Sequence, residues 1–267
     1  MNLWRPYAKA MLTNASLWFW AVAFMMFWLA IGAFLESSGV GPARLAVFAY
    51  TSAWYAVIVL IALSLLAAAI AGSFAYGSAS LAFAFRYTRL TPKGFLVSIV
   101  GGSAVLGLVL DVVLIGATAG MFGARFSTAI LPADAFGLVG MSVLGGVFFM
   151  ALSATLALAA INYLGLRSSN FVGYVPLLLS FVLGNAQVDV ALPRGVIYAS
   201  PFNDLTSLLF QGYSGTTPTA ELGTSSVPLD WPFLLVGLVL WTGILLASTL
   251  VLLERIRARH LEEGRQI

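Results

Sequence analysis

The chain has 267 residues, of which 61% are hydrophobic and 9% are charged, and its mean hydropathy is +0.99. A typical soluble domain has about a quarter of its residues charged, so this composition excludes a soluble globular fold, which could not cover so much apolar surface. One membrane-spanning helix takes roughly 20 residues, so the chain holds on the order of six and has no room for a large enzymatic domain.

The formal net charge is +3 at pH 7, and the sequence contains no cysteine. The basic residues flank apolar runs and do not form a stripe between polar segments, so they indicate membrane topology and no nucleic-acid partner. The lack of cysteine excludes disulfides, thiol catalysis and thiolate metal sites. We therefore expect a protein whose main partner is the lipid bilayer.

Six long apolar runs predict six membrane-spanning segments. Backbone groups in lipid must form their hydrogen bonds internally, and no run alternates as the strands of a barrel do, so the segments are expected to be helices. The predicted fold is a single all-α transmembrane domain, residues 1–267, with spans at about 15–35, 45–72, 95–123, 135–164, 171–187 and 233–253.

The distribution of lysine and arginine predicts the orientation of these spans, because basic residues favour the cytoplasmic side. The two termini and the even-numbered connections carry Arg5, Lys9, Arg86, Arg89, Lys93, Arg167, Arg255, Arg257, Arg259 and Arg265. The odd-numbered connections carry Arg44, Arg125 and Arg194, so the 13 basic residues divide ten against three. The sequence therefore predicts a multi-pass protein of the plasma membrane with both termini in the cytoplasm.

Three segments differ from plain spans and loops. Residues 1–14 place apolar side chains at helical spacing beside Arg5 and Lys9, which is typical of an interfacial helix. Residues 73–94 are rich in Gly and Ser yet carry aromatic and basic side chains, which predicts a cytoplasmic element with a protein contact or only a topology anchor. Residues 188–232 contain the apolar stretch 197–213, whose length suits a re-entrant segment better than a span.

The sequence offers no catalytic or metal-binding constellation on this chain. The single histidine, His260, lies in the charged tail after the last span, and the sequence contains no phosphate-binding loop of the form G-x-x-x-x-G-K-[ST]. Asp111 is the one acidic residue inside a predicted span. Such a residue either faces a cavity or a partner, or is neutral or bonded to a neighbouring Ser or Thr, and both alternatives stay open.

A pair of small residues and a cluster of basic residues each allow two interpretations. Gly116 and Gly120 form a small-xxx-small face, which predicts helix packing within the bundle or, less favoured, a dimer face. Arg86, Arg89 and Lys93 either anchor the topology or surround an apolar docking patch.

The order of these parts resembles the membrane (permease) subunit of type 2 ATP-binding-cassette exporters over nearly the whole chain. Such subunits have an N-terminal interfacial helix, six spans, a cytoplasmic coupling helix between spans two and three, and an extracellular re-entrant hairpin between spans five and six. The segment Gly77-Ser-Ala-Ser-Leu-Ala-Phe-Ala-Phe-Arg-Tyr-Thr-Arg-Leu-Thr-Pro-Lys93 resembles the coupling element, and Tyr198-Ala-Ser-Pro-Phe-Asn-Asp204 with the run to Tyr213 resembles the hairpin. The usual acidic residue near the start of the coupling element is absent from 73–85.

The resemblance implies that this chain is no enzyme and carries no cofactor. It implies a dimer with a second copy or a related permease chain, bound to separate P-loop ATPase subunits that hold ATP and Mg. The residues it assigns to ATPase coupling are Leu81, Phe83, Phe85, Arg86, Tyr87 and Arg89, and those it assigns to the hairpin are Pro201, Phe202, Asp204 and Tyr213. The alternative is a six-span channel or membrane assembly protein with no ATPase partner.

Overall fold

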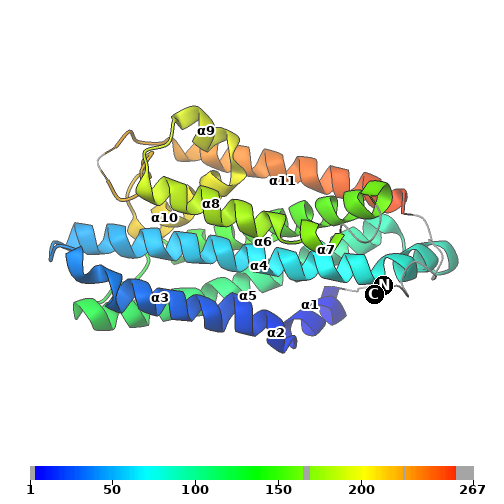
Figure 1. Ribbon diagram of the computed structural model, residues 1–267, viewed down its shortest axis with the longest axis horizontal. Helices are drawn as coiled ribbons and strands as arrows, with labels where there is room; N and C mark the ends of the chain where they lie inside the picture. The colour runs from blue at the N-terminus through cyan, green and yellow to red at the C-terminus, as the bar shows by residue number, and fades with distance from the viewer. Residues whose placement is uncertain (1–3, 165–168, 225, 257–267) are drawn as a thin grey trace.

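The computed structural model describes residues 4–164, 169–224 and 226–256, and the regular structure in this part is helical (Figure 1). The elements are α1 (Trp4–Leu12), α2 (Ala15–Trp18), the π-helical η1 (Phe19–Ala23), α3 (Phe24–Phe34), the 3-10 turn η2 (Glu36–Gly39), α4 (Arg44–Tyr87), α5 (Pro92–Phe126), α6 (Ala135–Ala159), the π-helical η3 (Ala160–Leu164), α7 (Ser169–Val172), α8 (Val175–Asp189), α9 (Arg194–Ala199), α10 (Pro201–Ser214) and α11 (Trp231–Glu254).

Five helical stretches in the described part are long and apolar enough to cross a membrane, which confirms the prediction of a multi-pass all-α membrane protein. They are Ala15–Gly39, Arg44–Phe74, Pro92–Phe126, Ala135–Leu164 and Trp231–Glu254. The predicted span at 171–187 corresponds to the end of α7 and to α8, a 15-residue helix about 23 Å long, which is shorter than a hydrocarbon core of about 30 Å. The six-span count therefore stays a prediction.

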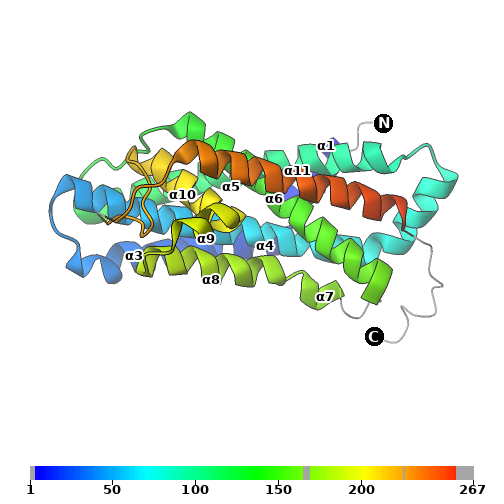
Figure 2. The same ribbon diagram turned by 90° about the horizontal axis from the view of Figure 1, so that it is seen from above.

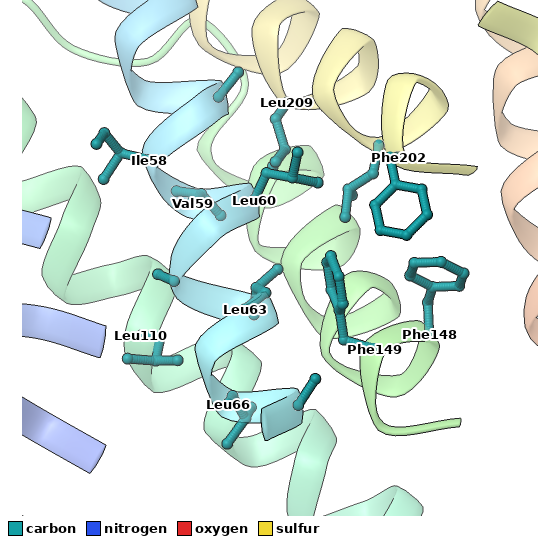
Figure 3. Close-up of a cluster of buried hydrophobic side chains, with 14 of the residues drawn as sticks. Ile58, Val59, Leu60, Leu63, Leu66, Leu110, Phe148, Phe149, Phe202 and Leu209 are labelled. Atoms are coloured by element: carbon teal, nitrogen blue, oxygen red, sulfur yellow. The ribbon is translucent and has the colours of Figure 1, made fainter. Parts of the chain in front are cut away.

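The long helices lie side by side in an elongated bundle with α4 near its centre (Figures 1 and 2). α4 packs against α3, α5, α6, α8 and α10. Figure 3 shows the buried cluster on one side of α4, where Leu60 and Leu63 face the rings of Phe149 and Phe202. The ring centroids of Phe148 and Phe149 lie 5.7 and 5.8 Å from that of Phe202, which fixes α10 against α6.

Small residues allow α5 and α6 to approach closely. A Cβ placed on Gly146 would lie 2.8 Å from the carbonyl oxygen of Ser103, and one on Gly107 would lie 2.5 Å from that of Ser142. Gly116 and Gly120 are instead exposed, and a Cβ on either would have nothing within 4 Å. The prediction that these two glycines pack within the bundle was therefore wrong, and the close helix contact uses a different pair.

The segment predicted to be a separate coupling helix continues α4 without a break. α4 has 44 residues and a length of about 66 Å, of which Arg44–Phe74 is the part apolar enough to span. Figure 2 shows the last turns of α4 leaving the direction of the rest of the helix at one end of the bundle, where they lead into α5. A glycine and serine pair occurs at Gly72 and Ser73, and such pairs are common sites of helix bending.

α5 begins directly after this turn. Thr91 is its N-cap and accepts a 3.1 Å hydrogen bond from the backbone N–H of Gly94, while Pro92 occupies the first turn, where its missing N–H costs nothing. α1 lies along α5, with Tyr7 packed against Gly102. Asn14 accepts hydrogen bonds from Ser16 and Leu17, so α1 is a separate helix before the first span.

The helices α9 and α10 lie in the half of the bundle that is farther from the turn between α4 and α5. After α8 ends at Asp189, the chain turns into α9 and reverses at Ser200 into α10 (Figure 1). Trp241, ten residues into α11, donates a 3.2 Å hydrogen bond to the carbonyl of Ala199, so the reversal lies about 15 Å along α11 from its start. The loop from 215 to 230 then returns to α11 and contains an isolated bridge between Thr219 and Pro228.

Candidate functional site

A groove of about 1340 Å³ runs along the outside of the bundle. α4 forms its floor, α2 to α3 form one wall and α8 forms the other, an arrangement visible in Figure 1, where α4 lies between α3 and α8. Along α4 the lining extends from Tyr50 to Ala69, 19 residues apart, which corresponds to about 29 Å. The groove is therefore about as long as the hydrocarbon core of a bilayer is thick.

The middle of the groove is apolar and aromatic, and its two ends are polar. The rings that line it are those of Trp20, Phe24, Trp28, Tyr50, Trp54, Tyr174 and Phe181. Asn14 and Ser16 lie at one end, and Glu36, Asn185 and Asp189 lie at the other. A cavity with an apolar body and a few polar groups at its ends is typical of a site for an amphipathic ligand.

Two contacts hold the α3 wall against the floor. The hydroxyl of Tyr50 donates a 2.9 Å hydrogen bond to the carbonyl of Gly32. The indole of Trp54 covers the same glycine so closely that a Cβ there would lie 2.5 to 2.8 Å from three ring atoms. Gly32 thus lets the wall and the floor meet, and any larger residue would displace the Trp54 ring.

The wall also contains a π-helical segment. The five residues Phe19–Ala23 form η1, and Trp20 from this segment lines the groove. Segments of π-helix are rare and occur frequently at functional sites, because the wider turn is less stable and is kept where it serves a purpose. The irregular turn of the first span therefore lies at the groove.

An exposed aromatic and basic patch occupies the end of α4. Phe83 is 60% exposed and Tyr87 is 67% exposed, and their ring centroids lie 4.6 Å apart. Arg86 and Arg89 are exposed beside them. We call these four residues the α4 patch. It is a surface of the composition that protein interfaces favour, with aromatic rings and arginine together.

Not every residue predicted for ATPase coupling belongs to this patch. Phe85 is half-buried and its ring packs edge-on against Phe95 of α5 at 5.7 Å, while Leu81 is also partly buried. Phe95 packs in turn against Phe74 at 6.1 Å. Phe85 thus stabilises the hairpin of α4 and α5, and the residues open to a partner are Phe83 and Tyr87.

Asp111 is fully buried where α5 meets α4. The hydroxyl of Tyr55 donates a hydrogen bond to its Oδ1, and its Oδ2 has no partner among the described residues. The ring of Tyr55 also packs at a tilt against that of Tyr213 in α10, with 4.6 Å between the ring centroids. Asp111 therefore faces neither the groove nor the surface. It bonds to Tyr55 of another helix, and the Ser142 side chain of α6 lies beside it.

The residues predicted for the hairpin are all buried in α10. Pro201 occupies the first turn, Phe202 packs on α6, and Tyr213 reaches the carbonyl of Ile130 at 3.4 Å. Asp204 is fully buried, neither of its carboxylate oxygens has a hydrogen-bond partner within the described part of the chain, and it lies against Gly237 of α11. The structure thus brings these residues into the bundle core and away from the groove.

A polar cluster that the sequence analysis did not predict joins α8 to α10. The amide of Gln187 donates to Ser207 at 2.7 Å, and the amide of Asn203 donates to the side chain of Gln187 at 3.0 Å and to the carbonyl of Leu183 at 3.0 Å. All three polar side chains are fully buried. They hold the second wall of the groove against α10.

No group of three or more His, Cys, Asp or Glu side chains that could hold a metal ion occurs in the part of the chain that the structure describes. No family model matches the sequence, and no curated protein matches it. The groove, the α4 patch and the contacts between them are therefore the features that bear on the function of the chain.

Proposed function

We propose that this chain is the permease subunit of an ATP-driven exporter, in which the groove is its share of the substrate path. One observation supports this above all. The same helix, α4, forms the floor of the groove from Tyr50 to Ala69 and ends in the exposed α4 patch. A partner that displaces the patch would move the floor of the groove without any intermediate element.

The α4 patch is the proposed contact with a separate P-loop ATPase subunit. Phe83 and Tyr87 present a pair of adjacent aromatic rings that could fill a pocket on the partner, and Arg86 and Arg89 would lie at the polar rim. ATP and Mg belong to that partner, because this sequence contains no phosphate-binding loop. Closure of the ATPase subunits would then push on the end of α4 and change the angle between the floor and the walls.

The substrate path would be completed by a dimer. The groove is open on the outside of the bundle, and the first span beside it presents exposed aromatic side chains, Phe19 and Phe27 among them. A second copy or a related chain that faces this side would cover the apolar surface and close the two grooves into one passage. The short helices α9 and α10 would form the re-entrant hairpin, which supports the α8 wall of the groove from the bundle core.

The charges at the two ends of the bundle support a cytoplasmic location for the α4 patch. Of the nine basic residues in the described part, six lie at the patch end: Arg5, Lys9, Arg86, Arg89, Lys93 and Arg255. The opposite end carries the acidic residues Glu36, Asp134, Asp189, Glu221 and Asp230. Positive charge favours the cytoplasmic side, where ATP and the ATPase are found.

Co-purification with P-loop ATPases of the same genome tests the proposal, starting with any encoded beside this chain. The double variant Phe83→Ala/Tyr87→Ala should lose the ATPase, because truncating a central interface anchor costs about 2 kcal/mol or more, roughly a 30-fold loss of affinity per residue. Arg86→Ala should retain it at low salt and weaken mainly as salt rises. Phe136→Ala is the matched control, since Phe136 is 94% exposed at the opposite end.

The isolated chain in lipid should hydrolyse no ATP, and hydrolysis should appear with the cognate ATPase. If the double variant Phe83→Ala/Tyr87→Ala captures as much ATPase as the wild-type chain does, the patch has no coupling role. Failure of every P-loop ATPase to bind the wild-type chain would favour a six-span channel or membrane assembly protein with no motor.

A further inference from the structure

The charges that line the groove are all of one sign. Two of its lining residues, Glu36 and Asp189, carry acidic side chains. None of the lining residues is a lysine, arginine or histidine, although the whole chain carries a formal charge of +3. The groove therefore differs in charge from the rest of the protein.

The two carboxylates stand at one end of an apolar surface. Glu36 follows α3 at the start of η2, and Asp189 is the last residue of α8, so they come from opposite walls at the same end of the bundle. Both side chains are exposed, so both are accessible to a ligand. The surface that leads to them is lined by Trp28 and Trp54, whose ring faces attract cations.

We propose that the groove binds lipophilic cations, with the apolar body of the ligand on the tryptophan rings and its positive charge beside Glu36 and Asp189. The assignment rests on the proposed function, because it names the class of molecule that would use the substrate path. An anionic amphipath would meet two negative charges and no basic side chain in the groove. A neutral acyl chain would fit the apolar part but gain nothing from the carboxylates.

Tetraphenylphosphonium and tetraphenylborate provide a matched pair of probes, because they are similar in size and shape and opposite in charge. Saturable binding would be measured by equilibrium dialysis against the full chain in nanodiscs of zwitterionic phosphatidylcholine, with empty nanodiscs subtracted. The wild-type chain should bind the phosphonium ion saturably and the borate ion without saturation. Phosphonium binding should also weaken as the ionic strength rises, because salt screens exposed charges.

The variants Glu36→Gln and Asp189→Asn should each weaken phosphonium binding roughly fivefold, the effect of one unit charge at about 4 Å in water. The double variant should bind at least tenfold more weakly and lose most of the salt dependence. Asp230→Asn is the control, because Asp230 is an exposed acidic residue at the same end that does not line the groove. It should bind as the wild-type chain does.

Three results would overturn the assignment: no saturable phosphonium binding, equal binding of the borate ion, or an unchanged affinity in the double variant. Each would indicate a groove filled by lipid chains and indifferent to charge. Co-purification of the ATPase with the same double variant separates this failure from failure of the proposed function. Normal ATPase capture with no phosphonium binding would reject the ligand class alone, whereas phosphonium binding with no ATPase partner would reject the exporter alone.

Discussion

The buried hydrogen bond between Tyr55 and Asp111 allows a sharp test of the packing of the bundle. Tyr55→Phe removes one oxygen and keeps the ring that packs against Tyr213. The substitution would leave Asp111 with the neighbouring Ser142 hydroxyl as its remaining polar contact among the described residues. The change therefore isolates the contribution of one hydrogen bond between α4 and α5.

The expected loss of stability follows from the burial of both groups. Leaving a buried acceptor without its donor costs about 1–3 kcal/mol in water-soluble proteins. Measured couplings between polar side chains in membrane helices are smaller, about 0.6 kcal/mol on average and about 1.7 kcal/mol at most. Because Asp111 is fully buried and Tyr55 makes its direct hydrogen bond, we expect a loss of about 1–2 kcal/mol for Tyr55→Phe.

A double-mutant cycle with Asp111→Leu would measure the pairwise energy directly. Unfolding of each variant in mixed micelles by increasing sodium dodecyl sulfate, followed by tryptophan fluorescence, gives the free energy of unfolding. Tyr55→Phe should be nearly neutral in the Asp111→Leu background, since the acceptor is already gone. Tyr174→Phe is the control, because Tyr174 is 55% exposed. The same loss in both backgrounds, or no loss in the wild-type background, would refute the hydrogen bond as a source of stability.

Two further predictions concern helix packing and topology. Gly146→Leu should destabilise the chain by about 1–3 kcal/mol in the same unfolding assay, because its side chain would collide with the backbone of α5, whereas Gly140→Leu on the same helix, where a Cβ meets nothing within 4 Å, should be tolerated. A cysteine at exposed Thr217 should react with an impermeant maleimide added to intact cells, and one at exposed Ser80 should react only after lysis, since native cysteines are absent; the opposite labelling pattern would invert the proposed topology.

The long spans were predictable from the sequence because each is an apolar run that matches the thickness of a bilayer. The segment 171–187 was less predictable, because it is divided: α7 ends at Val172, and α8 begins at Val175, just before Pro176. The continuity of α4 through Gly72 and Gly77 was not predictable from composition. Glycine costs about 1 kcal/mol relative to alanine in a helix, but packing of the following turn on α5, through Phe85 and Phe95, offsets this cost.

The division of the coupling residues could have been derived from helical geometry. Phe83 and Tyr87 are four residues apart and so share one face of a helix, while Phe85 lies two residues from each and points to the other side. The structure has this arrangement, with the first two exposed and the third packed on α5. The groove and the cluster of Gln187 and Asn203 could not be derived, because each joins helices that are distant in sequence.

The contacts of α4 limit how the groove can open. Near one end of the floor, Tyr55 ties α4 to Asp111 of α5 and to Tyr213 of α10, and near the other end Phe95 of α5 packs on both Phe74 and Phe85. The floor is thus joined to α5 at two depths and to α10 at one of them, so the three helices should move as one body. A force applied at the α4 patch would then shift this body against the two walls of the groove. The wall formed by α2 to α3 is the less regular of the two, because it contains the π-helical turn η1. We therefore expect the width of the groove to change between α4 and the first span.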